Sequence, residues 1–220
     1  MASRCEGREN RFYIVIAVFI ISLIISTVFF SDRELTAAYI SHEFLDDANW
    51  YDSGDRDSGS NFLGLEKWAS YTYKVDDDFY NASLSITSFK TLFMMSEDDL
   101  ISQTSNTIIE SAEELNITLD ENSKISGSRV VNLEHKTMYI IYNGYLTNNG
   151  VTEKVKIIGE TWNCAVSGTS IVCIGYAQIT SNSSEEKITH WAKLVIDREG
   201  TFGLGEYLGE DGLIFNVKCH

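Results

Sequence analysis

Residues 151–180 read VTEKVKIIGETWNCAVSGTSIVCIGYAQIT and contain two long strand-like runs, Val151–Cys164 and Ser170–Thr180. Between the runs stands Gly168-Thr169, and a Gly-X pair favours a two-residue type II′ turn. Such a turn would join the two runs as a β-hairpin. This stretch therefore predicts a protein built around an antiparallel sheet, which needs other elements to cover it.

Other strand-like runs lie on both sides of this hairpin. The one that directly precedes it is joined to it through Asn149-Gly150, the strongest short signal for a type I′ turn. Alternation of apolar and polar residues marks the remaining runs. The additional runs are Lys67–Val75, Ala82–Phe89, Ser128–Leu133, Thr137–Leu146 and Leu213–His220.

Two segments show helical signals. Ser96 is followed by three acidic residues, as at a capped helix N-terminus, and apolar or small residues then recur at helical spacing up to Leu115. Ser183, with Glu186 three residues later, opens a second helix over Ser184–Ile196. We therefore expect an α+β domain over residues 67–220, with a mostly antiparallel sheet and two covering helices.

The N-terminal segment predicts a membrane anchor. Phe12–Phe30 contains nineteen residues without a charge, which as a helix would be about 28 Å long, close to the thickness of the hydrocarbon core. Three arginines precede it, so the positive-inside rule places residues 1–11 in the cytoplasm and the rest of the chain outside. The apolar run is too long for the core of a cleaved signal peptide. We predict a single-pass protein of the cell membrane, anchored in the lipid bilayer through Phe12–Phe30.

Residues 31–66 are predicted to connect the anchor to the domain. Ser31–Trp50 has apolar residues at helical spacing, which favours a stalk that prolongs the membrane helix. Tyr51–Asn61 is rich in Gly, Ser and Asp and has almost nothing to bury, so we expect a flexible spacer. A calcium loop running from Asp55 to Glu66 is the alternative, but a serine occupies the position where such a loop needs glycine.

The charge of the chain excludes one class of function. The net charge is −15, and the first thirty residues have a balance of +1, so residues 31–220 carry −16. Binding to a phosphate backbone needs clustered Lys and Arg, and the sequence has no such cluster. We therefore expect no nucleic-acid partner.

Three cysteines fall in the predicted domain. With a two-residue turn at Gly168-Thr169, Cys164 lies opposite Cys173 at a non-hydrogen-bonded pair, within disulfide reach, and export favours the bond. Cys219 is expected to be a buried thiol, because the alternation of the last predicted strand places it on the apolar face. The alternative is a soft-metal site for copper or zinc that gathers Cys219, His220 and the hairpin thiols.

The sequence contains no recognisable catalytic or cofactor motif. H-E-x-x-H, the G-x-S-x-G elbow, the P-loop and G-x-G-x-x-G are all absent. The absence of these motifs does not exclude an enzyme whose catalytic residues are scattered along the sequence. We nevertheless expect no cofactor and favour a non-enzymatic role. Candidate glycosylation sequons begin at Asn81, Asn116 and Asn182, at predicted turns or helix ends.

Two resemblances add to these expectations. The order of strands and helices over residues 67–220 resembles the PsbP-like α/β sandwich, whose members are typically non-catalytic accessory modules outside a membrane. Several stretches also resemble an uncharacterised family of membrane-anchored archaeal proteins, from which no activity is implied. These stretches are HKTMYIIYNG (135–144), KIIGETWNC (156–164), SGTSIVCIGYAQIT (167–180) and LIFNVKCH (213–220).

Taken together, these features favour a membrane-anchored binding or assembly module that contacts another envelope protein. One alternative is a metal-handling or enzymatic ectodomain that uses the face carrying Cys164, Cys173 and Cys219. A third is a pilin-like subunit, since pilins also join a hydrophobic helix to a sheet domain. Measuring the metal content of the purified domain would distinguish the binding module from the metal-handling ectodomain, and the observation of filaments would identify a pilin-like subunit.

Overall fold

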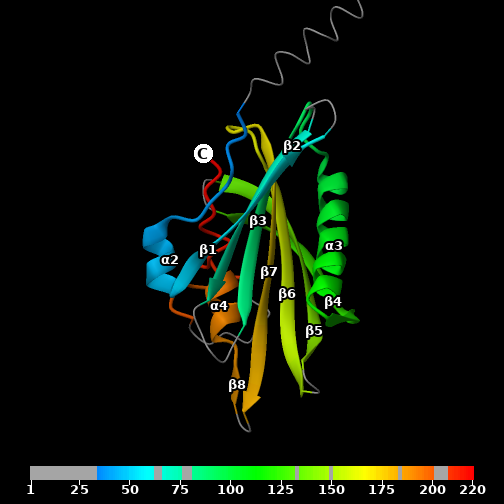
Figure 1. Cartoon of the computed structure of the whole chain (residues 1–220), viewed down its shortest axis with the longest axis vertical. Coiled ribbons are helices and arrows are strands. Elements are labelled where there is room, and N and C mark those ends of the chain that lie inside the picture. Colours follow the sequence, from blue (N-terminus) through cyan, green and yellow to red (C-terminus); the bar gives the residue numbers. More distant parts are fainter. Residues whose placement is uncertain are drawn as a thin grey trace, which may run out of the picture.

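The computed structural model describes most of the predicted domain (Figure 1). No helix in the described part of the chain is long and apolar enough to cross a membrane. The predicted anchor, Phe12–Phe30, lies outside that part, so it stays a prediction. The described residues are 34–61, 66–75, 81–131, 134–148, 151–182, 185–200 and 208–220.

Seven strands of the described chain form one antiparallel sheet, in the order β1–β2–β3–β7–β6–β5–β4, and the short β8 pairs with the end of β7. The predicted α+β class with a mostly antiparallel sheet is confirmed. The strands are β1 (Trp50–Ser60), β2 (Glu66–Val75), β3 (Ala82–Thr91), β4 (Ile117–Val131), β5 (His135–Asn148), β6 (Val151–Cys164), β7 (Thr169–Asn182) and β8 (Glu185–Lys187).

The sheet consists of two meanders, β1–β2–β3 and β4–β5–β6–β7. They meet at a seam where β3 pairs with β7, so that Phe89 lies opposite Ser170 and Ile86 opposite Cys173. Within the second meander, Asn148 of β5 lies opposite Val151 of β6. That register is the one the Asn149-Gly150 turn predicts, and the hairpin is confirmed.

The helix α3 (Glu97–Glu114) covers one face of the sheet. It begins where the sequence predicts, because Ser96 Oγ accepts a hydrogen bond of 3.1 Å from the Asp99 amide. Its buried residues are spaced one helical turn apart, as Leu100, Thr104, Ile108 and Ala112. Gly159 of β6 allows this close packing, since a Cβ there would lie only 2.6 Å from Thr104 Cγ2.

The opposite face is covered by two short helices, α2 (His42–Ala48) and α4 (Thr189–Val195), together with the segment 208–220 (Figure 1). Leu194 of α4 packs directly on Gly175 of β7, where an added Cβ would lie 2.8 Å from Leu194 Cδ2. The larger hydrophobic core therefore lies on this face. The described chain has three helices where the sequence predicted two.

The N-terminal connection differs from its prediction. Tyr51–Asn61 is not a flexible spacer, because Trp50–Ser60 forms the edge strand β1, paired with β2. The continuous helical stalk is also wrong for its described part, since residues 34–40 contain no helix and only α2 is helical. Ala38 and Trp50 are fully or almost fully buried. The folded domain thus includes residues that were predicted to link it to the membrane.

Two predictions near the C-terminus are also corrected. The late helix is shorter than Ser184–Ile196, because β8 takes residues 185–187 and α4 begins only at Thr189. The closing strand over Leu213–His220 does not form. Turns hold this segment against the core instead, and Lys218 makes a single β-bridge with Tyr39.

Candidate metal centre

The β6–β7 connection is a four-residue turn, residues 165–168, in which the Gly168 amide donates to the Cys164 carbonyl at 2.9 Å. Gly168 has a φ of +67°, a conformation that favours glycine. This turn places Cys164 opposite Thr169, and Cys173 opposite Glu160. The two cysteines are therefore separated by four strand residues, about 13 Å.

The predicted disulfide between Cys164 and Cys173 is consequently wrong in this structure. Both thiols are free and fully buried, and so is that of Cys219. The error arose from the turn, because a longer loop shifts the whole register. Cys173 instead lies opposite Glu160, four residues along the strand from Cys164, and outside the group that Cys164 forms with Cys219.

Four side chains come together at the end of β6 and beside the C-terminal segment. His135, Cys164, Cys219 and His220 each offer one ligand atom, and these atoms all lie within 4.8 Å of one another. Cys164 and Cys219 are fully buried, His135 is half-buried and His220 is exposed. The soft-metal alternative named Cys219 and His220 with the hairpin thiols. The structure joins them to Cys164 and adds His135.

The sheet positions the first two members of this Cys/His cluster. β5 and β6 pair with Met138 opposite Thr161, and continuing that register by three residues places His135 opposite Cys164. A ring stack of His135 on Trp162, with centroids 6.5 Å apart, holds the imidazole on the same side of the sheet. Both residues are therefore fixed by strand pairing and not by a mobile loop.

The C-terminal segment supplies the other two members. Lys218 and Tyr39 exchange two backbone hydrogen bonds of 2.8 and 2.9 Å. This bridge places Cys219 and His220 over the end of the sheet. Further from the cluster, Arg129 Nη1 donates to the Gly209 carbonyl at 2.7 Å. The segment is thus fastened at both of its ends.

The distances within the Cys/His cluster match a tetrahedral ion. Cys219 Sγ lies 3.3 Å from His135 Nε2 and 3.5 Å from His220 Nδ1, and Cys164 Sγ lies 3.5 Å from His220 Nδ1. Tetrahedral Zn²⁺ with ordinary Zn–S and Zn–N bonds has S···N edges of about 3.5 Å. These three S···N distances already fit such an ion, and the remaining ligand pairs lie within 4.8 Å.

The environment sets the protonation of these ligands. Burial raises the pKa of the Cys219 thiol to about 12, and its hydrogen bond with Cys164 adds to the rise. Burial acts in the same direction on Cys164, but hydrogen bonds from Cys219 and Ser167 outweigh it and hold the pKa of Cys164 below its usual range. Burial and the nearby His220 lower the pKa of His135. The neutral imidazole that metal binding requires is thereby favoured.

Trp162 adds a donor beside the sulfur atoms. Within the described residues, its buried Nε1–H has no hydrogen-bond partner at normal geometry. The indole is nevertheless close enough to Cys219 to oppose the rise in that thiol's pKa. Because a thiolate accepts hydrogen bonds much better than a thiol, metal binding at Cys219 would give this donor its missing partner. The orphaned donor therefore fits a metal-bound sulfur.

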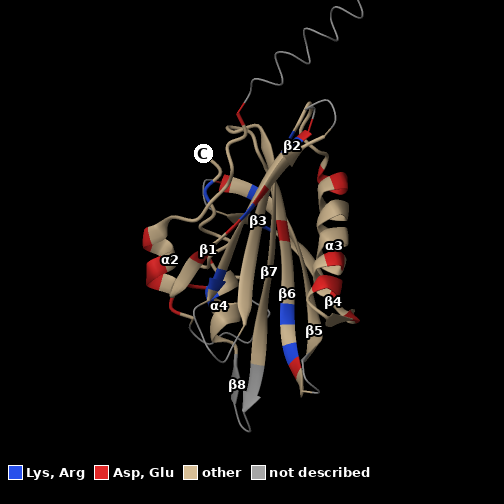
Figure 2. Ribbon diagram, viewed as in Figure 1, with Lys and Arg blue, Asp and Glu red and all other residues tan. Residues whose placement is uncertain are grey.

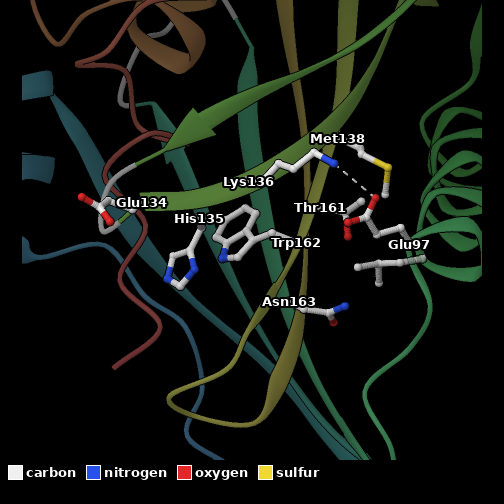
Figure 3. Close-up of a pocket in the computed structure, with 9 residues that line it drawn as sticks. Glu97, Glu134, His135, Lys136, Met138, Thr161, Trp162 and Asn163 are labelled. Carbon is white, nitrogen blue, oxygen red and sulfur yellow. Dashed lines mark ion pairs between the residues drawn. The ribbon is translucent and has the colours of Figure 1, made fainter.

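A pocket of about 260 Å³ reaches the Cys/His cluster from the side of α3 (Figure 3). His135 and Trp162 form one wall, and the ion pair of Lys136 with Glu97, 3.5 Å long, lies across from them. Asn163 lies at the other side, and its amide donates to the Met95 carbonyl at 2.9 Å. The half-buried His135 can thus be approached from solvent, which gives an ion a way in.

The other predicted sites lie apart from this cluster. Asn81, directly before β3, and Asn116, in the turn before β4, are both exposed and compatible with glycans, and Asn182 is at the end of β7. Residues 55–60 of the alternative calcium loop belong to β1, where Asp55 pairs with Lys74 at 2.8 Å. None of these residues approaches the Cys/His cluster.

Comparison with known proteins identifies no relative. No family model, curated protein or solved structure matches this chain. The resemblances to the PsbP-like sandwich and to membrane-anchored archaeal proteins therefore stay predictions.

Proposed function

We propose that this chain is a membrane-anchored extracytoplasmic module that binds a thiophilic metal ion, in the first place Zn²⁺, through the Cys/His cluster. The observation that carries the proposal is the convergence of four ligand atoms within 4.8 Å, from β5, β6 and the C-terminal segment. Two thiols and two imidazoles form a donor set that suits zinc. The assignment takes up the metal-handling alternative and changes its ligands.

The charge of the ligands favours a divalent ion over Cu⁺. Two thiolates and two neutral imidazoles give an uncharged complex with Zn²⁺, whereas Cu⁺ would leave one negative charge. Both sulfur atoms belong to fully buried residues, where an uncompensated charge is costly. Four protein ligands also complete a tetrahedron, as in structural sites, and leave no open position for a reacting molecule. A binding role is therefore favoured over catalysis.

We also propose that this module assembles with another envelope protein. Acidic residues gather on α2 and α3, which lie on the outside of the sheet (Figure 2), and this negative charge could receive a basic partner. Metal binding is the part that can be tested on the purified chain alone.

We expect the full-length protein, purified in detergent under reducing conditions and stripped of metal, to bind one Zn²⁺ per chain. Competition with a chromophoric chelator would give the affinity, and Co²⁺ substitution should produce the absorption of a tetrahedral thiolate site. Cys219→Ala should weaken Zn²⁺ binding by more than the roughly 10–100-fold that follows loss of an outer-shell partner.

Cys173→Ala is the matched control, because Cys173 is equally buried but lies outside the cluster. This variant should keep the wild-type affinity. Equal affinities in the two alanine variants would refute the site. So would peptide mapping that finds Cys164 linked to Cys219 in protein isolated from cells without reductant, since the ligands would then be a disulfide.

Zinc affinity is also expected to increase with pH. The Cys219 thiol, with a pKa of about 12, is protonated at pH 7, so an ion must displace its proton. Each displaced proton makes the apparent affinity rise about tenfold per pH unit. Between pH 6 and pH 8 we expect a gain of at least about 100-fold, measured by competition titration at each pH. A flat profile would exclude coordination by the Cys219 thiolate.

A further inference from the structure

The end of the sheet that carries the Cys/His cluster also exposes apolar side chains. In the β3–α3 connection, Phe93 is 84% exposed, Met94 48% and Leu92 40%. Val166, in the β6–β7 turn, is 72% exposed. Exposed apolar residues are ordinary when they are scattered, but grouped ones mark a contact surface. We call these four residues the apolar end.

The two loops of the apolar end lie side by side. β3 and β7 pair up to Phe89 opposite Ser170, so the β3–α3 connection and the β6–β7 turn lie at the same end of two neighbouring strands. The amide of Asn163, at the end of β6, also donates to the Met95 carbonyl at 2.9 Å. Residues 91–95 and 165–168 include no charged side chain. Both loops therefore expose apolar side chains, and no charged ones, at the same end of the sheet.

The same end is tied to the start of the described chain. Lys90 Nζ donates to the Glu34 carbonyl at 2.9 Å, and the Ala38 amide donates to Ser88 Oγ at 2.8 Å. Glu34 is thus fastened to β3 close to Leu92, and Figure 1 shows the segment from residue 34 starting at this end of the sheet.

The chain leaves little distance between this point and the predicted anchor. Phe30 ends the apolar run, so three residues separate it from Glu34. Four Cα–Cα steps span at most about 14 Å. With Phe12–Phe30 across the bilayer, Glu34 is therefore held within about 14 Å of the end of the anchor, and the apolar end lies at the end of the sheet to which Glu34 is fastened.

We propose that Leu92, Phe93, Met94 and Val166 contact the lipid bilayer and hold the domain with its Cys/His cluster at the membrane surface. The proposal rests on the membrane anchor in the proposed function. Its lipid contact is apolar and not electrostatic, because residues 31–220 carry a net charge of −16 and anionic lipids would repel them. Cys164 lies two residues before Val166, so a bound ion would be presented next to the membrane.

Fluorescence of an introduced tryptophan tests this contact in the full-length protein. We would reconstitute Phe93→Trp into nanodiscs of phosphatidylcholine that contain brominated lipid, and subtract the wild-type emission. Val151→Trp is the control, because Val151 is 60% exposed at the opposite end of β6, about 43 Å from Cys164. We expect the quenching of the Phe93→Trp signal to be at least threefold stronger than that of the control.

Two outcomes would overturn the lipid contact while leaving metal binding intact. One is equal quenching at the two positions, and the other is quenching of Phe93→Trp that occurs only with anionic phosphatidylserine. Flotation of the protein with vesicles after alkaline carbonate treatment checks the anchor itself, and failure to float would overturn both the anchor and the contact. Zinc titration of Phe93→Trp tests the metal site separately, and we expect this variant to bind Zn²⁺ with the wild-type affinity.

Discussion

Replacing Arg129 by methionine is expected to lower the free energy of unfolding by about 3–5 kcal/mol, because it leaves a buried carboxylate without its partner. Glu160 is completely buried, and Arg129 Nε and Nη2 donate to its two oxygens at 2.8 and 2.6 Å. Thr137 Oγ1 donates a third hydrogen bond of 2.6 Å. Urea denaturation followed by tryptophan fluorescence would measure the loss.

Two further variants show whether the unpaired charge causes this loss. The double variant Arg129→Met with Glu160→Met should recover much of the stability, since replacing both members of a buried pair by apolar residues is often nearly neutral. Lys74→Met removes an ion pair with the exposed Asp55 and should change stability little. A similar loss in Arg129→Met and Lys74→Met would contradict the argument.

Zinc is expected to produce the second large effect. At a free concentration about 1,000 times the dissociation constant, an ion that binds only the folded protein stabilises it by about 4 kcal/mol. For a domain of this size, that corresponds to a rise in Tm of about 8–16 °C. Melting of the full-length protein with Zn²⁺ and with a chelator would measure the difference. The bound ion would add four bonds between β5, β6 and the C-terminal segment.

The cysteine variants separate this effect from non-specific binding. Cys219→Ala should melt at the same temperature with Zn²⁺ and with chelator, whereas Cys173→Ala should retain the full zinc-dependent rise. If zinc stabilised Cys219→Ala as much as the wild type, the ion would bind elsewhere. The proposed cluster would then be a hydrogen-bonded group of thiols and imidazoles.

Much of this fold could be predicted from local sequence patterns. The strands β2, β3, β5, β6 and β7 and the helix α3 have strong periodicity, and Ser96 marks the start of α3 as predicted. Such signals depend on neighbouring residues alone, so one sequence contains them. The β5–β6 hairpin was predictable for the same reason, because Asn149-Gly150 fixes both the turn and the register.

β1 was missed because an edge strand does not need an apolar face. Its sequence, WYDSGDRDSGS, has no alternation, and most of its side chains are exposed. Backbone pairing with β2 and a contact of Arg56 over the Tyr71 ring, 4.1 Å from its centroid, hold it in place. Charged residues are common on edge strands, where they discourage pairing with other chains. Tertiary pairing, and not local pattern, determines this element.

The Cys/His cluster was only half predictable. The wrong partner for Cys164 came from assuming a two-residue turn where the chain makes a four-residue one. His135 could have been found, because the Asn149-Gly150 register, extended along the hairpin, places it opposite Cys164. No sequence pattern indicated that Cys219 and His220 would lie close to Cys164 and His135. It depends on packing of the segment 208–220 across the sheet, which no local pattern reports.

The seam between β3 and β7 also bears on how fast and in what order the protein folds. Hairpins within each meander can close in about 1–10 μs. The seam joins residues at least about 80 positions apart, so its contacts form only after a large loss of chain entropy and raise the contact order of the protein. Cys219 and His220 reach the sheet beside the Tyr39–Lys218 bridge, and the neighbouring Ala38 amide is bound to Ser88 of β3, whereas His135 and Cys164 belong to the other meander. A chain still in the course of folding therefore lacks the cluster, and metal acquisition becomes a late event that reports on completed folding.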